Sequence, residues 1–332
     1  MMYDEKTARE LVVQAGHRLL ERGLVARTWG NISARVSDTH FVITPSGRAY
    51  ETLQPEDLVR VSIADCAYEG ERKPSSEKGI HAAVYQRRKD VGFVIHTHQD
   101  HASCVGVGGK DLIGLAHPIL GDCVPCAAYG MPSTKKLQKG VEAAMDTHPT
   151  AAAILMRQHG ALCMAEDMEK TFAVAEALEE LSRTIFEQTV TLPHATPADG
   201  SELLAALRAA APGKYFSIEN HSAAMLIAAE GKTLHPHLDD LAQIAGTSIR
   251  CAKDDCNAIL GALKGRNAAF VPGFGAVCCA EEEDDLGAIA AIIRKSCMAA
   301  LYAKHCGAAP LNPLDRHIMR LVYTMKYSKK KA

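Results

Sequence analysis

Two short apolar runs in this sequence end at histidines, and this pattern constrains both the fold and the chemistry. The run Val91–Ile95 is followed by His96-Thr97-His98, and the run Ala153–Met156 is followed closely by His159. Alternate residues of a strand project to the same side, so the rings of His96 and His98 can converge where the first strand ends. We therefore expect these three histidines to bind one metal ion.

A carboxylate adds the group that such a site would need for proton transfer. Glu77 follows two serines and opens a helix predicted over 77–88, for which Ser76 is a suitable N-cap. Three histidines and one carboxylate beside an open coordination position form a catalytic zinc site. Glu77 is thus the expected general acid/base, although it could also ligate the ion at rest. The helix dipole alone would also favour a glutamate there.

The expected ion is Zn²⁺, with another first-row divalent metal as the alternative, because the proposed ligands are imidazoles. Two further histidines lie close to these motifs in the sequence. His81 follows Glu77 by one helical turn, and His101 follows His98. Each could support the site from behind or form an ordinary structural hydrogen bond.

Short polar residues in turns predict an anion-binding surface. The candidates are Asn31, Ser46, Gly47, Ser75 and Ser76, which offer small polar side chains and backbone N–H groups. The two serines precede a helix N-terminus, where oriented N–H groups favour a phosphate. Helix capping and turn chemistry would explain each residue separately, so the proposal requires the turns to meet.

Composition excludes several other classes of protein. The formal net charge of the 332 residues is -2, which predicts no nucleic-acid partner and no acidic membrane surface. We expect no membrane span, because no apolar run approaches the ~20 residues that cross a bilayer. We also expect no signal peptide, because the first residues lack its apolar core. Eleven cysteines without disulfide-scaffold spacing fit reduced thiols. We expect a cytoplasmic protein.

Periodicity predicts alternating helices and strands, and a weak internal repeat. The expected helices cover 4–24, 77–88, 134–147 and 168–188, and the expected strands cover 34–36, 41–43, 58–63, 91–96 and 151–156. Gly160–Glu166 matches Gly275–Glu281 in five of seven positions. His117–Asp122 resembles His235–Asp240, and Phe93–His98 resembles Phe216–His221. The pairs keep their order, with offsets of 115, 118 and 123, which favours a duplicated half.

The second half has lost the metal chemistry of the first. Glu219 stands in the place of His96, Phe274 in the place of His159, and only His98 keeps a counterpart, His221. We expect a catalytic domain over 1–192, a linker over 193–200, and a degenerate repeat over 201–332 that serves packing or assembly.

Taken together, these motifs resemble the class II aldolase/adducin family over about residues 5–190. The resemblance is carried by Gly30–Ser33, Ile43–Gly47, Pro74–Glu77, His96–His98 with His101, and Gln158–Gly160. It implies α/β/α layers around a mostly antiparallel central sheet, and the internal repeat adds the expectation of a truncated second copy of that fold. It further implies zinc on the three histidines, acid/base chemistry on Glu77, and a homo-oligomer with active sites at subunit interfaces.

The implied activity is that of a zinc-dependent aldolase. It would cleave a phosphorylated ketose, a sugar 1-phosphate similar to fuculose phosphate, to dihydroxyacetone phosphate and an aldehyde through a metal-stabilised enediolate. The alternatives are an epimerase, dehydratase or decarboxylase on the same scaffold, or a non-catalytic adducin-like assembly protein. The chain departs from the family's aldolases by having no tyrosine in Leu112–Cys126, and the epimerase aspartate has no clear counterpart in Asp111 or Asp122.

Overall fold

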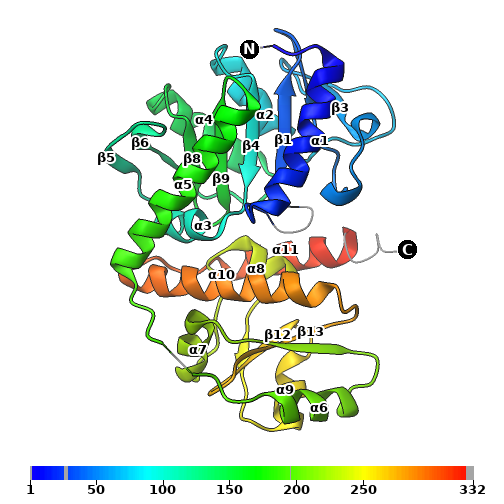
Figure 1. Ribbon diagram of the computed structural model, residues 1–332, viewed down its shortest axis with the longest axis vertical. Helices are drawn as coiled ribbons and strands as arrows, with labels where there is room; N and C mark the ends of the chain where they lie inside the picture. The colour runs from blue at the N-terminus through cyan, green and yellow to red at the C-terminus, as the bar shows by residue number, and fades with distance from the viewer. Residues whose placement is uncertain (1, 26–28, 195, 327–332) are drawn as a thin grey trace. The chain divides into compact units, whose positions relative to one another are not determined.

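The computed structural model describes residues 2–25, 29–194 and 196–326 (Figure 1). The chain divides into two compact units, Met1–Ile185 and Phe186–Ala332. This division falls within a long helix, α5 (Met168–Thr189), ahead of the linker expected over 193–200. Each unit has its own sheet and its own apolar core, so the two are described separately.

A seven-stranded sheet forms the centre of the first unit. Its strands are β1 (Asn31–Arg35), β2 (His40–Ile43), β3 (Val59–Ser62), β4 (Phe93–Thr97), β7 (Cys126–Ala127), β8 (Ala153–Met156) and β9 (Gly160–Ala165). Their spatial order is β3-β2-β1-β4-β9-β8-β7. The sheet is mixed, because β7 runs parallel to β8 while the other described pairs are antiparallel. The prediction of a mostly antiparallel sheet is therefore corrected to a mixed sheet, because the edge strand β7 is parallel to its neighbour.

Helices cover both faces of this sheet. The helices of the unit are α1 (Glu5–Glu21), α2 (Lys78–Arg87), α3 (Asp100–Gly106), α4 (Lys135–Thr147) and α5. Figure 1 shows α1 and α5 in front of the sheet and α2 and α4 behind it. Ile80 of α2, Val141 of α4 and Val94 of β4 belong to one buried cluster on the latter side. Strands covered on both faces read as continuous apolar runs, which is why Phe93–Ile95 shows no polar alternation.

Helix starts follow the capping chemistry in two places and depart from it in a third. Asp4 caps α1 by accepting from Thr7 N at 3.0 Å, and Thr134 caps α4 by accepting from Leu137 N at 3.3 Å. The predicted cap of α2 is wrong, since Ser76 lies outside the helix and Glu77 occupies the N-cap position. A short hairpin, β5 (Leu112–His117) and β6 (Gly121–Val124), forms a separate two-stranded sheet.

The second unit is built around a four-stranded sheet. Its elements are α6 (Ser201–Ala210), β10 (Tyr215–Glu219), α7 (Ser222–Ala229), α8 (Asp239–Ile244), β11 (Arg250–Cys251), α9 (Cys256–Leu263), β12 (Ala268–Val271), β13 (Gly275–Ala280), α10 (Asp285–Cys306) and α11 (Pro313–Lys326). The strand order is β10-β13-β12-β11, with β11 and β12 parallel and the other described pairs antiparallel. The β4-β9-β8-β7 part of the first sheet has the same order and the same strand directions.

One helix, α10, is long and apolar enough to cross a membrane by length and composition, contrary to the expectation that no apolar run approaches that length. Its most apolar window is 61% buried. It also carries Lys295, which is buried and forms an ion pair with Asp240 of α8. A mostly buried apolar helix with an internally paired charge is typical of a protein core.

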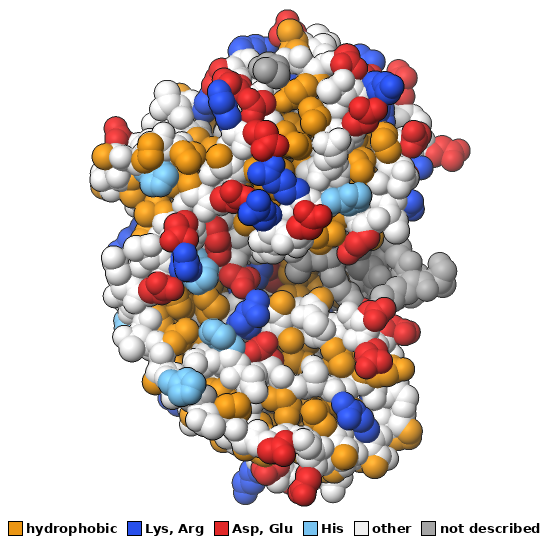
Figure 2. Space-filling model, viewed as in Figure 1, with side chains coloured by type: hydrophobic (Ala, Val, Ile, Leu, Met, Phe, Trp, Pro, Cys, Tyr) orange, Lys and Arg blue, Asp and Glu red, His pale blue; other side chains and the backbone are white. Residues whose placement is uncertain are grey.

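Charged side chains of both signs intermingle on the face drawn in Figure 2. Acidic and basic groups are also close in number, 39 and 37, over the whole chain. Mixed surfaces of this kind produce weak long-range fields.

Arg35 provides a test of how the first sheet is joined to α2. Its side chain is 1% exposed and donates to the carbonyls of Val91 at 2.9 Å and of Tyr85 and Arg88 at 2.8 Å. We predict that Arg35→Met lowers the free energy of unfolding by about 3 kcal/mol, because buried carbonyls lose their donors. Urea denaturation of the full chain measures this.

The matched control is Arg60→Met on β3, whose side chain is 51% exposed and pairs with Glu5 at 3.3 Å. It should change stability by less than about 1 kcal/mol. Equal unfolding midpoints for the two variants would contradict the role given to Arg35.

Candidate metal centre

The pairing of β4 with β9 brings the three predicted histidines together. His96 lies opposite Leu162 and Thr97 opposite Ala161, so the turn before β9, which carries His159, reaches the end of β4. The close approach depends on Gly160. A Cβ atom there would lie 2.2 Å from the carbonyl oxygen of Thr97 and 3.1 Å from Cε1 of His96. A glycine is therefore required at the point where the second histidine motif meets the first.

The three imidazoles form one buried cluster. One ring nitrogen of each of His96, His98 and His159 lies within 4.8 Å of the others. The ring centroids are 4.6 to 4.8 Å apart, and the Nε2 atoms of His96 and His98 are separated by 3.0 Å. The sequence predicts that these residues bind one ion, and in the structure their ring nitrogens are close enough together to ligate a single ion.

The protonation of His96 suits a metal ligand. Its Nδ1 lies 2.9 Å from the carbonyl oxygen of Ala161 and must donate to it, which leaves Nε2 with its lone pair toward the cluster. Burial lowers the pKa of His96 well below its usual value, the Glu77 carboxylate opposes this, and His98 and His159 add to the lowering. His96 is therefore neutral near pH 7. Neutral ring nitrogens converging in a buried site fit a divalent cation such as zinc.

Glu77 joins this cluster from the start of α2. Its Oε2 lies 3.4 Å from Nε2 of His96, and its Oε1 lies 3.4 Å from Nε2 of His159. Asn31 donates its Nδ2–H to Oε2 at 3.0 Å, and the backbone N–H of Ser133 points to Oε1 at 3.4 Å. Burial alone would raise the pKa of Glu77, but the hydrogen bonds offered by the His159 ring and the Asn31 amide hold it below its usual range. The carboxylate is ionised and can accept a proton.

The turns that carry the predicted phosphate ligands do meet. Ser46 N donates to the carbonyl of Lys73 at 3.0 Å, and Ser75 N donates to the carbonyl of Thr44 at 3.0 Å. Gly47 has a φ of +71°, which lets the first turn reverse. Ser75 is buried and its Oγ accepts from Glu77 N at 3.2 Å. The two turns are therefore neighbours, which the sequence alone does not establish.

The other predicted residues have different partners. Ser76 bonds through its Oγ to the hydroxyl of Ser133 at 2.7 Å rather than capping α2. The amide of Asn31 lies between Glu77 and His81, so its side chain is engaged within the protein. His101 pairs with Glu179 at 2.8 Å, which agrees with the structural alternative for this residue.

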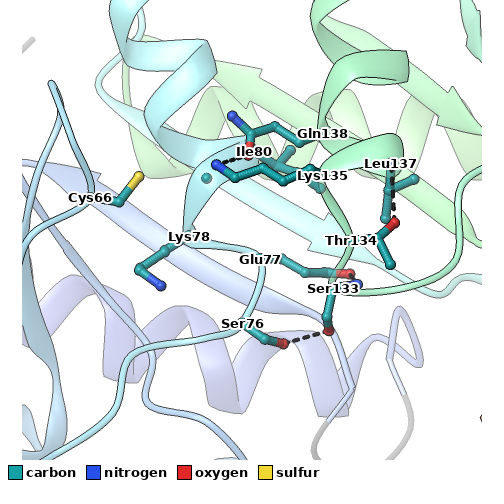
Figure 3. Close-up of a pocket in the computed structure, with 11 residues that line it drawn as sticks. Cys66, Ser76, Glu77, Lys78, Ile80, Ser133, Thr134, Lys135, Leu137 and Gln138 are labelled. Atoms are coloured by element: carbon teal, nitrogen blue, oxygen red, sulfur yellow. Dashed lines mark hydrogen bonds between the residues drawn. The ribbon is translucent and has the colours of Figure 1, made fainter.

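A small pocket opens beside Glu77, between the first turns of α2 and α4 (Figure 3). Its volume is about 120 Å³, and Lys78 and Lys135 are the cationic groups among its lining residues. Figure 3 shows the hydroxyls of Ser76 and Ser133 joined at one side of it. Sequence reasoning missed Ser133, because the backbone N–H that it offers to Glu77 depends on a φ of +64° that a serine rarely adopts.

Fold and site together define an α/β domain with a buried cluster of three histidines and a glutamate, and comparison with known proteins gives its family. The model of the class II aldolase and adducin N-terminal domain matches residues 10–186. The chain belongs to this family, and it is an enzyme of the class II aldolase superfamily. The resemblance stated from the sequence motifs is confirmed.

Three relatives illustrate the range of activities in the superfamily. The chain is 35% identical over 202 residues to a 5-deoxy-D-ribulose 1-phosphate aldolase of Bacillus thuringiensis serovar kurstaki, covering 59% of this chain and 93% of that one. It is 31% identical over 204 residues to the L-ribulose-5-phosphate 4-epimerase UlaF of Salmonella paratyphi B, covering 58% and 89%. A solved L-fuculose 1-phosphate aldolase superposes with a TM-score of 0.52 at 28% identity, covering 61% and 95%.

We predict that His98→Ala abolishes stoichiometric metal binding, because a buried three-nitrogen cluster would lose one of its ligands. Metal analysis of the purified full chain by mass spectrometry measures the ion-to-protein ratio. The control is His17→Ala, which removes an exposed histidine of α1. An unchanged metal content in His98→Ala would remove His98 from the set of ligands.

Proposed function

We propose that this protein is a zinc-dependent aldolase that cleaves a phosphorylated ketose, a sugar 1-phosphate, to dihydroxyacetone phosphate and an aldehyde. The observation that carries the proposal is an ionised, buried carboxylate 3.4 Å from two of three clustered imidazoles. The aldolase relatives act on sugar 1-phosphates by name, and one of them is covered over 93% of its length. These relatives favour aldol cleavage over other reactions of the superfamily.

His96, His98 and His159 would hold the ion. When bound, the ion would withdraw electron density from the oxygens of the substrate and so stabilise an enediolate. Glu77 accepts the proton of the hydroxyl on the carbon that leaves as the aldehyde, while the carbon–carbon bond breaks. The electron pair of that bond goes to the carbon next to the carbonyl, which Glu77 then protonates to give dihydroxyacetone phosphate. Glu77 is 8% exposed, so few water molecules compete with the substrate for its carboxylate.

The substrate phosphate would lie on the two adjoining turns. Ser46, Gly47, Ser75 and Ser76 are proposed to bind it through hydroxyl and backbone N–H groups. The backbone bonds between Thr44 and Ser75 and between Lys73 and Ser46 support this assignment. Asn31 is kept among the proposed phosphate ligands through its backbone at the start of β1, because its side-chain amide is already shared by Glu77 and His81.

Epimerisation of a pentulose phosphate is the second candidate. It is favoured by the likeness to an L-ribulose-5-phosphate 4-epimerase and by the absence of a tyrosine from 112–126. Directly before that segment Asp111 accepts from Cys126 N at 2.7 Å, and within it Asp122 lies exposed on β6. Dehydration and decarboxylation are the remaining alternatives.

We infer further that residues 201–332 are a truncated copy of the catalytic fold kept for assembly of a homo-oligomer. The shared strand order and directions of β10-β13-β12-β11 and β4-β9-β8-β7 support this. Gly275 repeats the role of Gly160, since a Cβ there would lie 2.4 Å from the carbonyl oxygen of Glu219. His221 instead caps α7 by accepting from Ala223 N at 3.2 Å. A cytoplasmic location is proposed because none of the eleven cysteines forms a disulfide.

We predict that Glu77→Gln keeps the metal and lowers kcat by a factor of about 10² to 10⁴, the range for loss of a general acid/base. Steady-state kinetics on metal-assayed protein measures this. Glu166→Gln, on a side chain 49% exposed, is the control and should act like the parent enzyme. A Glu77→Gln enzyme with the parental kcat would show that another group moves the proton.

The reaction type is tested by the products. We expect the metal-loaded enzyme to release dihydroxyacetone phosphate from a ketose 1-phosphate, detected by a coupled reduction assay. Conversion of a pentulose 5-phosphate to its epimer, without release of dihydroxyacetone phosphate from any ketose 1-phosphate, would instead establish the second candidate.

A further inference from the structure

A buried row of polar side chains runs from Glu77 into the interior of the first unit. Asn31 and Ser33 are alternate residues of β1 and therefore project from the same face of the sheet. His81 and Tyr85 follow Glu77 at intervals of four along α2, so they form one stripe on that helix. Ser33, His81 and Tyr85 are 0% exposed, and Asn31 is 5% exposed. No step of the proposed reaction uses His81, Ser33 or Tyr85.

These side chains form a continuous series of hydrogen bonds. Asn31 Nδ2 lies 3.0 Å from Glu77 Oε2, and Asn31 Oδ1 contacts His81 Nε2. On the other side of the ring, His81 Nδ1 lies 2.6 Å from Ser33 Oγ. Ser33 Oγ in turn lies 2.8 Å from the hydroxyl of Tyr85. Both strand residues thus alternate with helix residues in a single chain of contacts.

The direction of this chain follows from the Asn31 amide, which places its Nδ2 at 3.0 Å from Glu77 Oε2 and its Oδ1 against His81 Nε2. An amide NH₂ group only donates and an amide oxygen only accepts. That oxygen needs a donor, which places the proton of His81 on Nε2 and leaves Nδ1 to accept from Ser33. Ser33 then accepts from Tyr85. Burial keeps the ring neutral, because it lowers the pKa of His81 to about 4.

We propose that His81 is a positioning residue that fixes the orientation of the Asn31 amide and thereby holds Glu77 at the metal cluster. The reversed amide would place a carbonyl oxygen against the carboxylate and leave His81 Nε2–H without its acceptor. Both changes cost free energy in a buried site. The inference rests on the proposed role of Glu77 as acid/base. It explains why β1 and α2 share polar groups in an otherwise apolar layer.

The tautomer of His81 tests the chain without any assay of activity. Long-range ¹H–¹⁵N correlation spectra of the ¹⁵N-histidine-labelled full chain, assigned by comparison with His81→Gln, report which ring nitrogen carries the proton. The proposal predicts a neutral ring protonated on Nε2 near pH 7. A ring protonated on Nδ1, or on both nitrogens, would overturn it. In Tyr85→Phe the tautomer should persist, since only the last donor of the chain is lost.

Kinetics test the positioning role itself. His81→Leu removes the donor to Asn31 and should lower kcat by a factor of about 10 to 100, with KM and metal content little changed. His81→Gln retains an N–H donor near the position of Nε2 and should recover most of that loss. His148→Leu, at the end of α4, is the control and should match the parent.

Two kinetic results would overturn the proposal. One is a parental kcat in His81→Leu, and the other is an equal loss in His81→Leu and His81→Gln, which would indicate a purely structural role. If His81→Leu does not fold, Ser33→Ala replaces it, with a smaller fall in kcat expected at unchanged metal content and a parental kcat contradicting the proposal. If the parent enzyme cleaves no phosphorylated ketose, the proposed function fails, while the tautomer measurement still decides this inference.

Discussion

The antiparallel pairing of β4 with β9 is the contact on which the candidate site depends. It sets His159 beside His96 and His98, and it is possible only because Gly160 lets the two backbones approach. Burial of three imidazoles in one space disfavours their protonation, and their ring nitrogens are suitable ligands for a divalent metal ion. The Glu77 carboxylate balances that positive charge from the opposite element, α2. The register of β4 against β9 therefore determines which charged groups meet at the site and which chemistry they can perform.

Much of this arrangement could be predicted from the sequence, because short apolar runs that end at histidines specify both a strand and a ligand. The period of two places His96 and His98 on one side, the second apolar run adds His159, and the predicted helix start adds Glu77. The sequence could not reveal the parallel edge strand β7, since two residues carry no periodic signal. The prediction of Ser76 as the N-cap of α2 is also wrong. Serine commonly caps helices, but here its hydroxyl bonds to Ser133 instead.

The role of Asn31 shows why local patterns are insufficient for assigning a site. As a polar residue in a glycine-containing turn it suggested phosphate binding, but the pairing of β1 with β4 places it opposite His96. From there its amide reaches Glu77 and His81. Only the three-dimensional register distinguishes a residue that would face the substrate from one that supports the catalytic group. The same register accounts for the buried polar row behind Glu77.

The central claim is that one divalent ion is held by imidazole nitrogens in the first unit. X-ray absorption spectroscopy at the zinc edge, on the full chain purified without added metal and reconstituted with one equivalent of zinc, tests it most directly. The account predicts a first shell of nitrogen or oxygen atoms with the outer-shell scattering of three imidazoles. A first shell containing sulfur, or zinc that fails to bind, would contradict it.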